Sequence, residues 1–296
     1  MPLRMIMTWI RVRGHLEFSL FSWAARLKLM KYPRHLRNGG TELQKHDYHL
    51  QSIISFTMRL LIMNFDARKL EDQIEIRGWN YLTDAVEKKQ SVVLLTSHLG
   101  VPQLLRWYLR SQIFEVLHLY KLRNAERAQS LSGKIYLWTK RRHNNEEENL
   151  IGEEELSTQS LKRAYDHLLK KGLVSIAGDA YNGKRRLQAT VFSRKCPFAI
   201  GGLTLAAMTQ SVVIPCFSDI DPDGTIRIHL TEPIECPLNL PRDQQLESML
   251  QEYTCRIEEY LLQYPTHTPK FVKGMFAALE QYASDPEVVQ PLRPAA

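Results

Sequence analysis

Two side chains capable of acid–base chemistry each follow an apolar run that is typical of a buried strand. His98 follows residues 91–97, and Asp179 comes shortly after residues 173–177. An imidazole is the side chain most often used as a general base, and a carboxylate can orient it. Because ligand crevices in open α/β sheets lie beyond the carboxyl ends of the strands, we expect both side chains at one edge of a sheet. The alternatives are a histidine satisfied by local hydrogen bonds and an aspartate that caps a turn.

The residues after His98 are expected to change the direction of the chain. Gly100 predicts a turn, and Val101 and Pro102 predict the start of a helix, since proline fits the first helical turn. His98 would then lie where a strand ends and a helix begins. Such a junction is where this class of fold binds its ligands.

Cationic side chains follow Asp179 without an intervening acid. Lys184, Arg185 and Arg186 come first, and two more cations follow near residue 195. Guanidinium and ammonium groups bind phosphate, so this stretch is a candidate for contact with an anionic substrate; the alternative is a solvated loop. The candidate substrate-binding residues are Arg123, Asn182, Gly183, Arg185, Arg194 and Lys195.

The motifs of several enzyme classes are absent from the sequence. It contains no GxSxG elbow, no GxxxxGKS/T loop, no GxGxxG after a strand and no HExxH pair. Serine hydrolase, P-loop, dinucleotide-binding and zincin chemistries therefore lack their main residues. The four cysteines form no CxxC pair, which argues against a zinc site and against a disulfide framework. We expect neither a bound metal ion nor a cofactor.

Short apolar strands alternate with helices along the chain. This order favours an α/β fold with a mixed, mainly parallel central sheet flanked by helices. Runs of opposite charge in residues 140–155 predict an exposed loop, and DPDG at residues 221–224 predicts a turn between two strands. The expected strands are 74–76, 91–97, 114–119, 173–177, 187–192, 212–217 and 225–230. The expected helices are 46–64, 79–88, 101–111, 125–139, 158–171, 200–209 and 244–263.

Length and composition indicate a folded protein with a large core. A chain of 296 residues, of which 44% are hydrophobic, can bury such a core. We expect three parts along it. Residues 1–66 form a helical N-terminal region that could associate with a membrane, residues 67–285 form the α/β domain that carries the chemistry, and residues 286–296 form a loose tail.

The formal net charge of +7 is unevenly distributed. Residues 1–48 carry nine Lys or Arg against three acids, and residues 104–145 carry nine against two. Basic clusters beside aromatic residues suit an anionic partner, either a nucleic acid or an anionic membrane surface. The alternative for each run is a solvated face.

The N-terminal residues predict an amphipathic helix. No run approaches the roughly 18 apolar residues that a membrane-spanning helix needs, and charged residues interrupt any signal-peptide core. Trp and Leu fall on one helical face and Arg on the opposite face, which suits a helix at a membrane interface; the alternative is a helix packed on the core. The expected apolar face holds Ile6, Trp9, Leu16, Leu20, Trp23 and Leu27, and the opposite face holds Arg4, Arg11 and Arg26.

Two blocks of the sequence resemble one protein family. Residues 74–103, which end in SHLGVPQ, look like the segment of the bacterial lipid A biosynthesis (lauroyl/myristoyl) acyltransferases that leads into their HxxxxD/E motif. Residues 172–217 are similar to the later block of that family, with an apolar strand, a DQ-type loop, an aromatic-Gly-Arg-Pro-like segment, a small-residue helix and a VVP strand. The two blocks occur in the right order and span about half of the chain.

The resemblance implies an enzyme that works at a membrane surface. Such enzymes move an acyl chain from an acyl-CoA or acyl-carrier-protein thioester to a hydroxyl or amine of a glycolipid or lysophospholipid-type acceptor. By that analogy His98 is the general base that removes the proton of the acceptor hydroxyl. The resemblance also implies a cytoplasmic protein, peripheral on the inner face of the cell membrane. Its partners would be the thioester donor, the lipid acceptor, acyl carrier protein and an anionic membrane surface, with no nucleic acid.

One residue of the catalytic motif departs from the family pattern. The acid five residues after the histidine is replaced by Gln103. A glutamine oxygen can accept a hydrogen bond from the imidazole, but it cannot stabilise the charge of an imidazolium. Asp179 is the best candidate for a replacement carboxylate. Without one, the fold could serve as an accessory protein that binds acyl chains or lipid; a nucleic-acid-binding protein ranks third, because no binding motif supports it.

Overall fold

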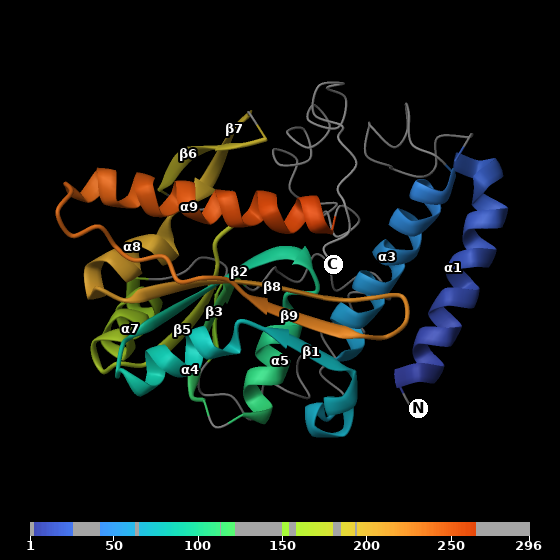
Figure 1. Ribbon diagram of the computed structural model, residues 1–296, viewed down its shortest axis with the longest axis horizontal. Helices are drawn as coiled ribbons and strands as arrows, with labels where there is room; N and C mark the ends of the chain where they lie inside the picture. The colour runs from blue at the N-terminus through green and yellow to red at the C-terminus, as the bar shows by residue number, and fades with distance from the viewer. Residues whose placement is uncertain are drawn as a thin grey trace.

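A seven-stranded sheet forms the centre of the fold (Figure 1), in a computed structural model that describes residues 3–25, 42–62, 65–112, 114–121, 150–153, 158–179, 185–192 and 194–264. The strands lie in the order β1-β9-β8-β2-β5-β3-β4. Every neighbouring pair is parallel except β8 and β9, which run antiparallel. The expected mixed, mainly parallel sheet is therefore confirmed. Its strands are β1 (Ile74–Arg77), β2 (Val92–Gly100), β3 (Val116–Lys121), β4 (Leu150–Glu153), β5 (Leu173–Ala177), β8 (Val212–Ile220) and β9 (Ile226–Leu230).

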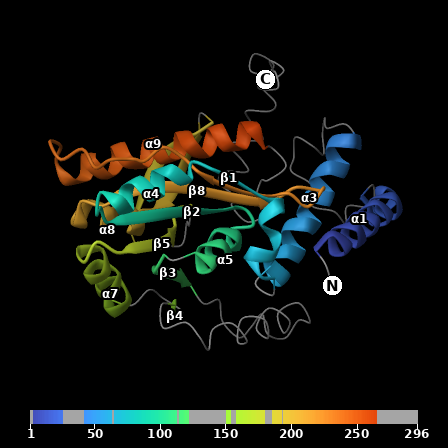
Figure 2. The same cartoon turned by 60° about the horizontal axis from the view of Figure 1, so that its bottom comes forward.

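Helices cover both faces of this sheet (Figures 1 and 2). Val93 and Leu95 of β2 belong to the buried cluster that includes α7, α8 and α9, whereas Val92 and Leu94 belong to the cluster that includes α1, α3, α4 and α5. A strand buried on both faces is apolar along its whole length, which is why residues 91–97 read as a continuous apolar run. The helices are α1 (Leu3–Ala25), α3 (Glu42–Leu61), α4 (Trp79–Glu87), α5 (Gln103–Ser111), α7 (Thr158–Leu169), α8 (Gly201–Thr209) and α9 (Arg242–Gln263), with a 3₁₀ helix at Ala67–Gln73.

The N-terminal helices α1 and α3 lie side by side at one end of the sheet (Figures 1 and 2). Leu3, Met7 and Ile10 of α1 are buried in the same cluster as residues of α3 and of the sheet. The side-chain nitrogen of Gln51 on α3 donates to the Asp219 carboxylate on β8 over 2.8 Å. The helix pair is thus packed on the core, while the boundary expected at residue 66 stays a prediction.

The buried face of α1 differs from the apolar face expected from the sequence. Met7 and Ile10 point into the core, whereas Trp9 and Leu16, which belong to the expected face, are exposed. The helix therefore has apolar side chains on two faces, one packed on the protein and one directed to its surroundings. Among the residues that the structure describes, no helix is both long and apolar enough to cross a bilayer.

Two strands were missed by the sequence patterns. Leu150–Glu153 forms β4 within the expected loop, because β3 offers an edge that this short apolar stretch can pair with. Arg194–Ala199 forms β7, which pairs with β6 (Arg186–Val191) in a separate two-stranded sheet. Pro197 and two cations make this stretch unlike a strand, but proline is tolerated in strands that are not central to a sheet. The helix expected at residues 125–139 and the tail at 286–296 lie outside the described residues.

Candidate active site

His98 lies in an irregular part of β2. The strand pairs with β8 in register up to Thr96 and Cys216, and pairing resumes at Gly100 and Ser218. Residues 97–99 of β2 thus lie opposite a single residue of β8. A bulge of this kind bends the strand and redirects its side chains. It places the imidazole of His98, near the middle of the irregularity, at the carboxyl end of the sheet.

The bulge ends at a glycine that no other residue could easily replace. Gly100 has a φ of +59°, and a Cβ built there would lie 2.4 Å from the Ser218 carbonyl oxygen. The next residue is held by the same partner, since the Val101 N–H donates to the Ser218 carbonyl over 2.7 Å and the Ser218 hydroxyl donates to the Val101 carbonyl over 2.9 Å. The Gly turn expected after His98 is present, and α5 begins at Gln103 with Pro102 at its N-cap.

Asp179 follows β5 and contacts His98 twice. Its Oδ1 lies 2.7 Å from Nδ1 of the imidazole, and its Oδ2 accepts the backbone N–H of His98 over 2.5 Å. The carboxylate is fully buried, whereas the imidazole is 47% exposed. β2 and β5 are neighbours with parallel register, and this brings their carboxyl ends together. The two side chains that the sequence placed at strand ends therefore meet at one edge of the sheet.

This geometry determines the tautomer of His98. An ionised carboxylate can only accept hydrogen bonds, so the proton of the neutral imidazole belongs on Nδ1. The basic lone pair is then on Nε2, on a ring that reaches the surface. A buried carboxylate next to Nδ1 also stabilises the imidazolium that forms when Nε2 takes up a proton. The pair can therefore act as a general base with a built-in counter-charge.

Tyr253 on α9 lies beneath this pair. Its hydroxyl donates to the Thr96 carbonyl over 3.2 Å, two residues before His98. Burial, and after it the nearby charge of Asp179, raises the pKa of Tyr253 well above its usual value. The sequence patterns did not single it out, because a tyrosine within an amphipathic helix has the same pattern as an ordinary core residue.

Gln103 does not replace the motif acid in this geometry. The Nδ1 atom that a glutamine oxygen could have oriented is already paired with Asp179. The amide oxygen of Gln103 is buried at the start of α5 and accepts no hydrogen bond among the described residues. The bulge and the end of β5 bring the Asp179 carboxylate to that atom, and the catalytic role expected of Gln103 stays a prediction.

The predicted substrate-binding residues are only partly described. Arg185 is exposed and pairs with the Asp243 carboxylate over 2.6 Å. Lys195 is exposed on β7, and Arg194 is the first residue of that strand. Arg123, Asn182 and Gly183 lie outside the described residues.

Histidine, cysteine and carboxylate side chains are the usual protein ligands of metal ions. Nowhere in this part of the chain do three or more His, Cys, Asp or Glu side chains gather in a way that could hold a metal ion. Cys196 and Cys216 are buried.

Comparison with known proteins identifies the family. The model of the bacterial lipid A biosynthesis acyltransferases matches residues 47–267, a range that contains His98, Gln103 and Asp179. A solved structure, the 1-acyl-sn-glycerophosphate (LPA) acyltransferase PlsC from Thermotoga maritima, is similar with 12% identity and a TM-score of 0.35, over 87% of this chain and 98% of that one. No curated protein matches the chain. The family match confirms the resemblance of residues 74–103 and 172–217, and the chain belongs to the bacterial lipid A biosynthesis acyltransferase family.

Proposed function

We propose that this protein transfers a fatty acyl chain from an acyl-CoA or acyl-carrier-protein thioester to a hydroxyl or amine of a glycolipid or lysophospholipid-type acceptor. The observation that carries the proposal is the contact between the His98 imidazole and the buried Asp179 carboxylate. Family membership supplies the reaction class, and this contact supplies a base that suits it. No cofactor is needed, because the thioester is itself the activated acyl group.

The reaction follows from the tautomer of His98. Nε2 takes the proton of the acceptor hydroxyl as its oxygen attacks the thioester carbonyl carbon. The imidazolium is stabilised by Asp179 while the tetrahedral intermediate exists. When the intermediate collapses, the C–S bond breaks and the proton on Nε2 passes to the leaving sulfur. The products are an ester and a free thiol, and His98 returns to its neutral form.

The accessory alternative has less support than the sequence alone suggested. It rested on Gln103, which deprives the motif of its acid. With Asp179 within hydrogen-bond distance of Nδ1, the imidazole has a counter-charge from another strand. We therefore favour turnover over lipid binding alone. We retain Arg123, Asn182, Gly183, Arg185, Arg194 and Lys195 as the proposed contacts for the anionic parts of the substrates.

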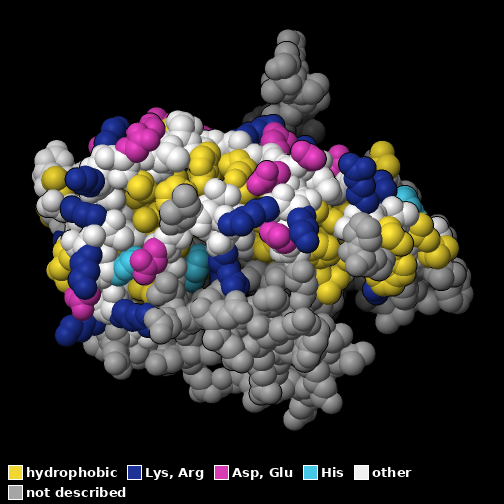
Figure 3. Space-filling view, turned by 90° about the horizontal axis from the view of Figure 1, so that it is seen from below, with side chains coloured by type: hydrophobic (Ala, Val, Ile, Leu, Met, Phe, Trp, Pro, Cys, Tyr) yellow, Lys and Arg dark blue, Asp and Glu magenta, His cyan; other side chains and the backbone are white. Residues whose placement is uncertain are grey.

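We further propose that the protein works on an anionic membrane surface, on the inner face of the cell membrane, and docks through α1. Figure 3 shows hydrophobic side chains gathered over the N-terminal helix pair, at the right of the view. Met5, Trp9, Val12 and Leu16 are between 52% and 58% exposed and follow one face of the helix. Three arginines and one glutamate occur in α1, and Arg13 lies over the Trp9 ring at 5.4 Å. Apolar side chains flanked by cations suit the headgroup region of an anionic bilayer.

Acyl transfer can be measured without knowing the acceptor in advance. The full chain is incubated with lauroyl-, myristoyl- and palmitoyl-CoA, or the same acyl groups on acyl carrier protein, and a bacterial lipid extract. Thiol release and mass spectrometry of the lipids report the reaction. We expect transfer that His98→Ala abolishes and that His118→Gln, a matched histidine on another strand, leaves intact. Transfer that survives His98→Ala would exclude this base, and lipid binding without any transfer would favour the accessory alternative.

Membrane docking has a separate test with its own control. Co-sedimentation with vesicles of anionic phospholipid is compared with neutral vesicles. The double variant Trp9→Ser, Leu16→Ser is expected to lose most of its binding, while Leu238→Ser, an exposed leucine elsewhere, keeps it. Equal binding by the two variants would contradict docking through α1.

A further inference from the structure

The start of the β2 bulge is held by two donors that converge on one carbonyl group. The Thr96 oxygen accepts the Gly178 N–H over 2.8 Å and the Tyr253 hydroxyl over 3.2 Å. Thr96 is two residues before His98, and Gly178 is the residue before Asp179. The carbonyl thus lies at the point where the two strand ends that carry the His98–Asp179 pair leave the regular sheet.

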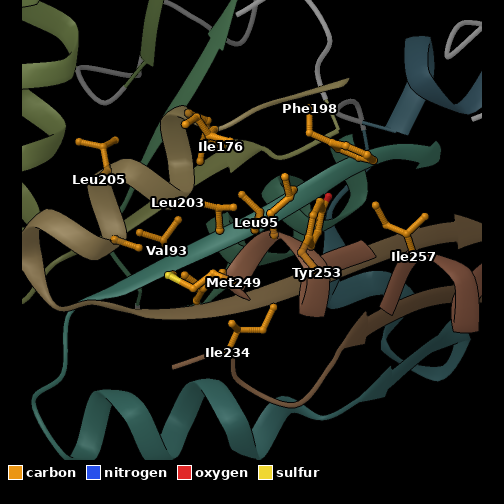
Figure 4. Close-up of a cluster of buried hydrophobic side chains, with 14 of the residues drawn as sticks. Val93, Leu95, Ile176, Phe198, Leu203, Leu205, Ile234, Met249, Tyr253 and Ile257 are labelled. Atoms are coloured by element: carbon orange, nitrogen blue, oxygen red, sulfur yellow. The ribbon is translucent and has the colours of Figure 1, made fainter. Parts of the chain in front are cut away.

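Tyr253 reaches this carbonyl from a hydrocarbon environment. Its side chain is fully buried in the cluster that contains Leu95 and Phe198. Figure 4 shows its hydroxyl oxygen directed toward the strand that carries Leu95. Burying a hydroxyl costs free energy unless it is hydrogen-bonded, and a phenylalanine would fill the same space without that cost. The hydroxyl therefore contributes something that packing does not require.

The state of this hydroxyl is well defined. Burial, together with the nearby negative charge of Asp179, disfavours the phenolate and keeps the pKa of Tyr253 well above its usual value. A neutral phenol donates its single proton, and the Thr96 carbonyl is the acceptor. Tyr253 thus links α9 to β2 as a neutral donor.

We propose that Tyr253 is a positioning residue for the His98–Asp179 pair. Its hydroxyl fixes the position of the Thr96 carbonyl, which also accepts the Gly178 N–H. The ends of β2 and β5 are thereby held so that Nδ1 of His98 stays within hydrogen-bond distance of the Asp179 carboxylate. The opposite end of the bulge is fixed by Ser218 against Gly100 and Val101. His98 is then held between two anchored points. The activity part of this inference rests on the proposed function, but the geometric part does not.

The variant Tyr253→Phe removes the anchor and leaves the packing in place. Loss of one hydrogen bond that acts on the geometry of the pair is expected to lower kcat about tenfold, with little change in KM, because the hydroxyl does not touch the substrate. The matched control is Tyr260→Phe, a second buried tyrosine on α9 that stacks on Phe217. The control is expected to keep the wild-type kcat. A raised KM with unchanged kcat, or equal losses in the two variants, overturns the proposal.

A spectroscopic measurement separates positioning from a general loss of stability. In protein labelled with ¹⁵N only in histidine, the Nδ1 proton of His98 should give a slowly exchanging downfield signal that Asp179→Asn removes. We expect Tyr253→Phe to broaden this signal or to speed its exchange about tenfold, while Tyr260→Phe leaves it unchanged. An unchanged signal in Tyr253→Phe overturns the proposal, whether or not acyl transfer is observed. If acyl transfer is absent from the wild type, the proposed function fails while this signal still decides the role of Tyr253.

A second probe keeps the proposal testable where Tyr253→Phe does not fold. A 3-fluorotyrosine at residue 253 retains the hydroxyl and the size of the ring. Its ¹⁹F resonance should shift when Asp179→Asn removes the charge beside it, and the shift should be larger than that of the same probe at residue 260. Equal shifts at the two positions would contradict the link between Tyr253 and the pair.

Discussion

Two histidines lie on strands at either side of β5 and meet opposite surroundings. His98, at the end of β2, has a carboxylate 2.7 Å from Nδ1 and a side chain that is 47% exposed. His118, within β3, is 9% exposed. Burial, with a smaller effect from Arg106 and Arg110, lowers the pKa of His118 to about 3. The His98 ring thus has a carboxylate partner and reaches the surface, whereas burial disfavours the protonated form of His118.

The difference arises from position along a strand. His118 pairs with Ser175 in the regular part of the sheet, where its side chain is almost completely covered. His98 lies in the bulge, past the point where regular pairing ends, so the ring is directed outward while its backbone is still held. An imidazole therefore becomes a base through its partners and its place in the sheet, and residue type alone says little.

The largest effect is expected from replacing Asp179, the carboxylate partner that His98 has and His118 lacks in the described contacts. Asp179→Asn preserves the shape of the site but cannot fix the tautomer or stabilise the imidazolium, so we expect turnover to fall by about 10⁴-fold. Steady-state acyl transfer measures this loss, with circular dichroism to show that the variant is folded. A loss of less than tenfold would mean that the two histidines differ only in exposure.

The second largest effect is expected from disturbing the bulge in β2, which distinguishes the surroundings of His98 from those of His118. In Gly100→Ala a Cβ would meet the Ser218 carbonyl at 2.4 Å with φ at +59°. We expect a loss of about 3 kcal/mol in the free energy of unfolding, together with loss of acyl transfer. Urea denaturation gives the stability change. The matched control is Gly201→Ala at the start of α8, where a Cβ meets nothing within 4 Å, so it should be neutral or slightly stabilising.

The third prediction concerns the effect of the buried His118 on the pH dependence of stability. Between pH 6.5 and about 3 the unfolded chain protonates His118 while the folded chain does not. Stability therefore decreases as pH falls through this window, by at most about 1.4 kcal/mol per pH unit. Between pH 7 and pH 4.5 the free energy of unfolding of His118→Gln should therefore fall by about 2 kcal/mol less than that of the wild type. Urea denaturation at several pH values measures the difference, and parallel curves would show that His118 is not held neutral.

The smallest effect concerns the residue at the motif position. Gln103→Ala removes an amide oxygen that is buried and accepts no hydrogen bond in the described part of the chain. We expect acyl transfer within about threefold of wild type and no loss of stability, since an unsatisfied acceptor contributes none. A large fall in kcat would show that Gln103 contributes to turnover, so that the Asp179 contact alone would not explain the difference between His98 and His118.

The fold class followed from local patterns that the structure reproduces. β5 spans the expected residues 173–177, and α8 and α9 differ from expectation by one or two residues at their starts. β5 is an apolar run and α9 buries residues at helical spacing, so both patterns are clear, while α8 is apolar on nearly all sides. β4 and β7 were missed because their stability comes from a partner strand. Leu150 and Ile151 form a strand only because β3 is beside them.

The site was accessible from the sequence only in part. His98 and Asp179 could each be placed at a strand end, but their contact depends on β2 and β5 being neighbours, which no local pattern encodes. Motif spacing pointed to Gln103, and the bulge makes that spacing a poor guide to distance from the imidazole. Tyr253 and Tyr260 lie seven residues apart on the buried face of α9, and only the structure shows that the hydroxyl of Tyr253 reaches the Thr96 carbonyl.

The strand order also governs how this protein is completed during synthesis. β1 pairs with β9, and β2 lies between β5 and β8, so each early strand has a partner that is made much later. Pairing over such sequence distances is slow and leaves apolar strand edges exposed on the nascent chain. The emerging polypeptide is therefore vulnerable to aggregation until residue 230 has left the ribosome. Leu246, Tyr253 and Ile257 of α9 lie in the buried cluster with Val93 and Leu95 of β2, so a chain truncated before α9 would leave this face of the strand uncovered.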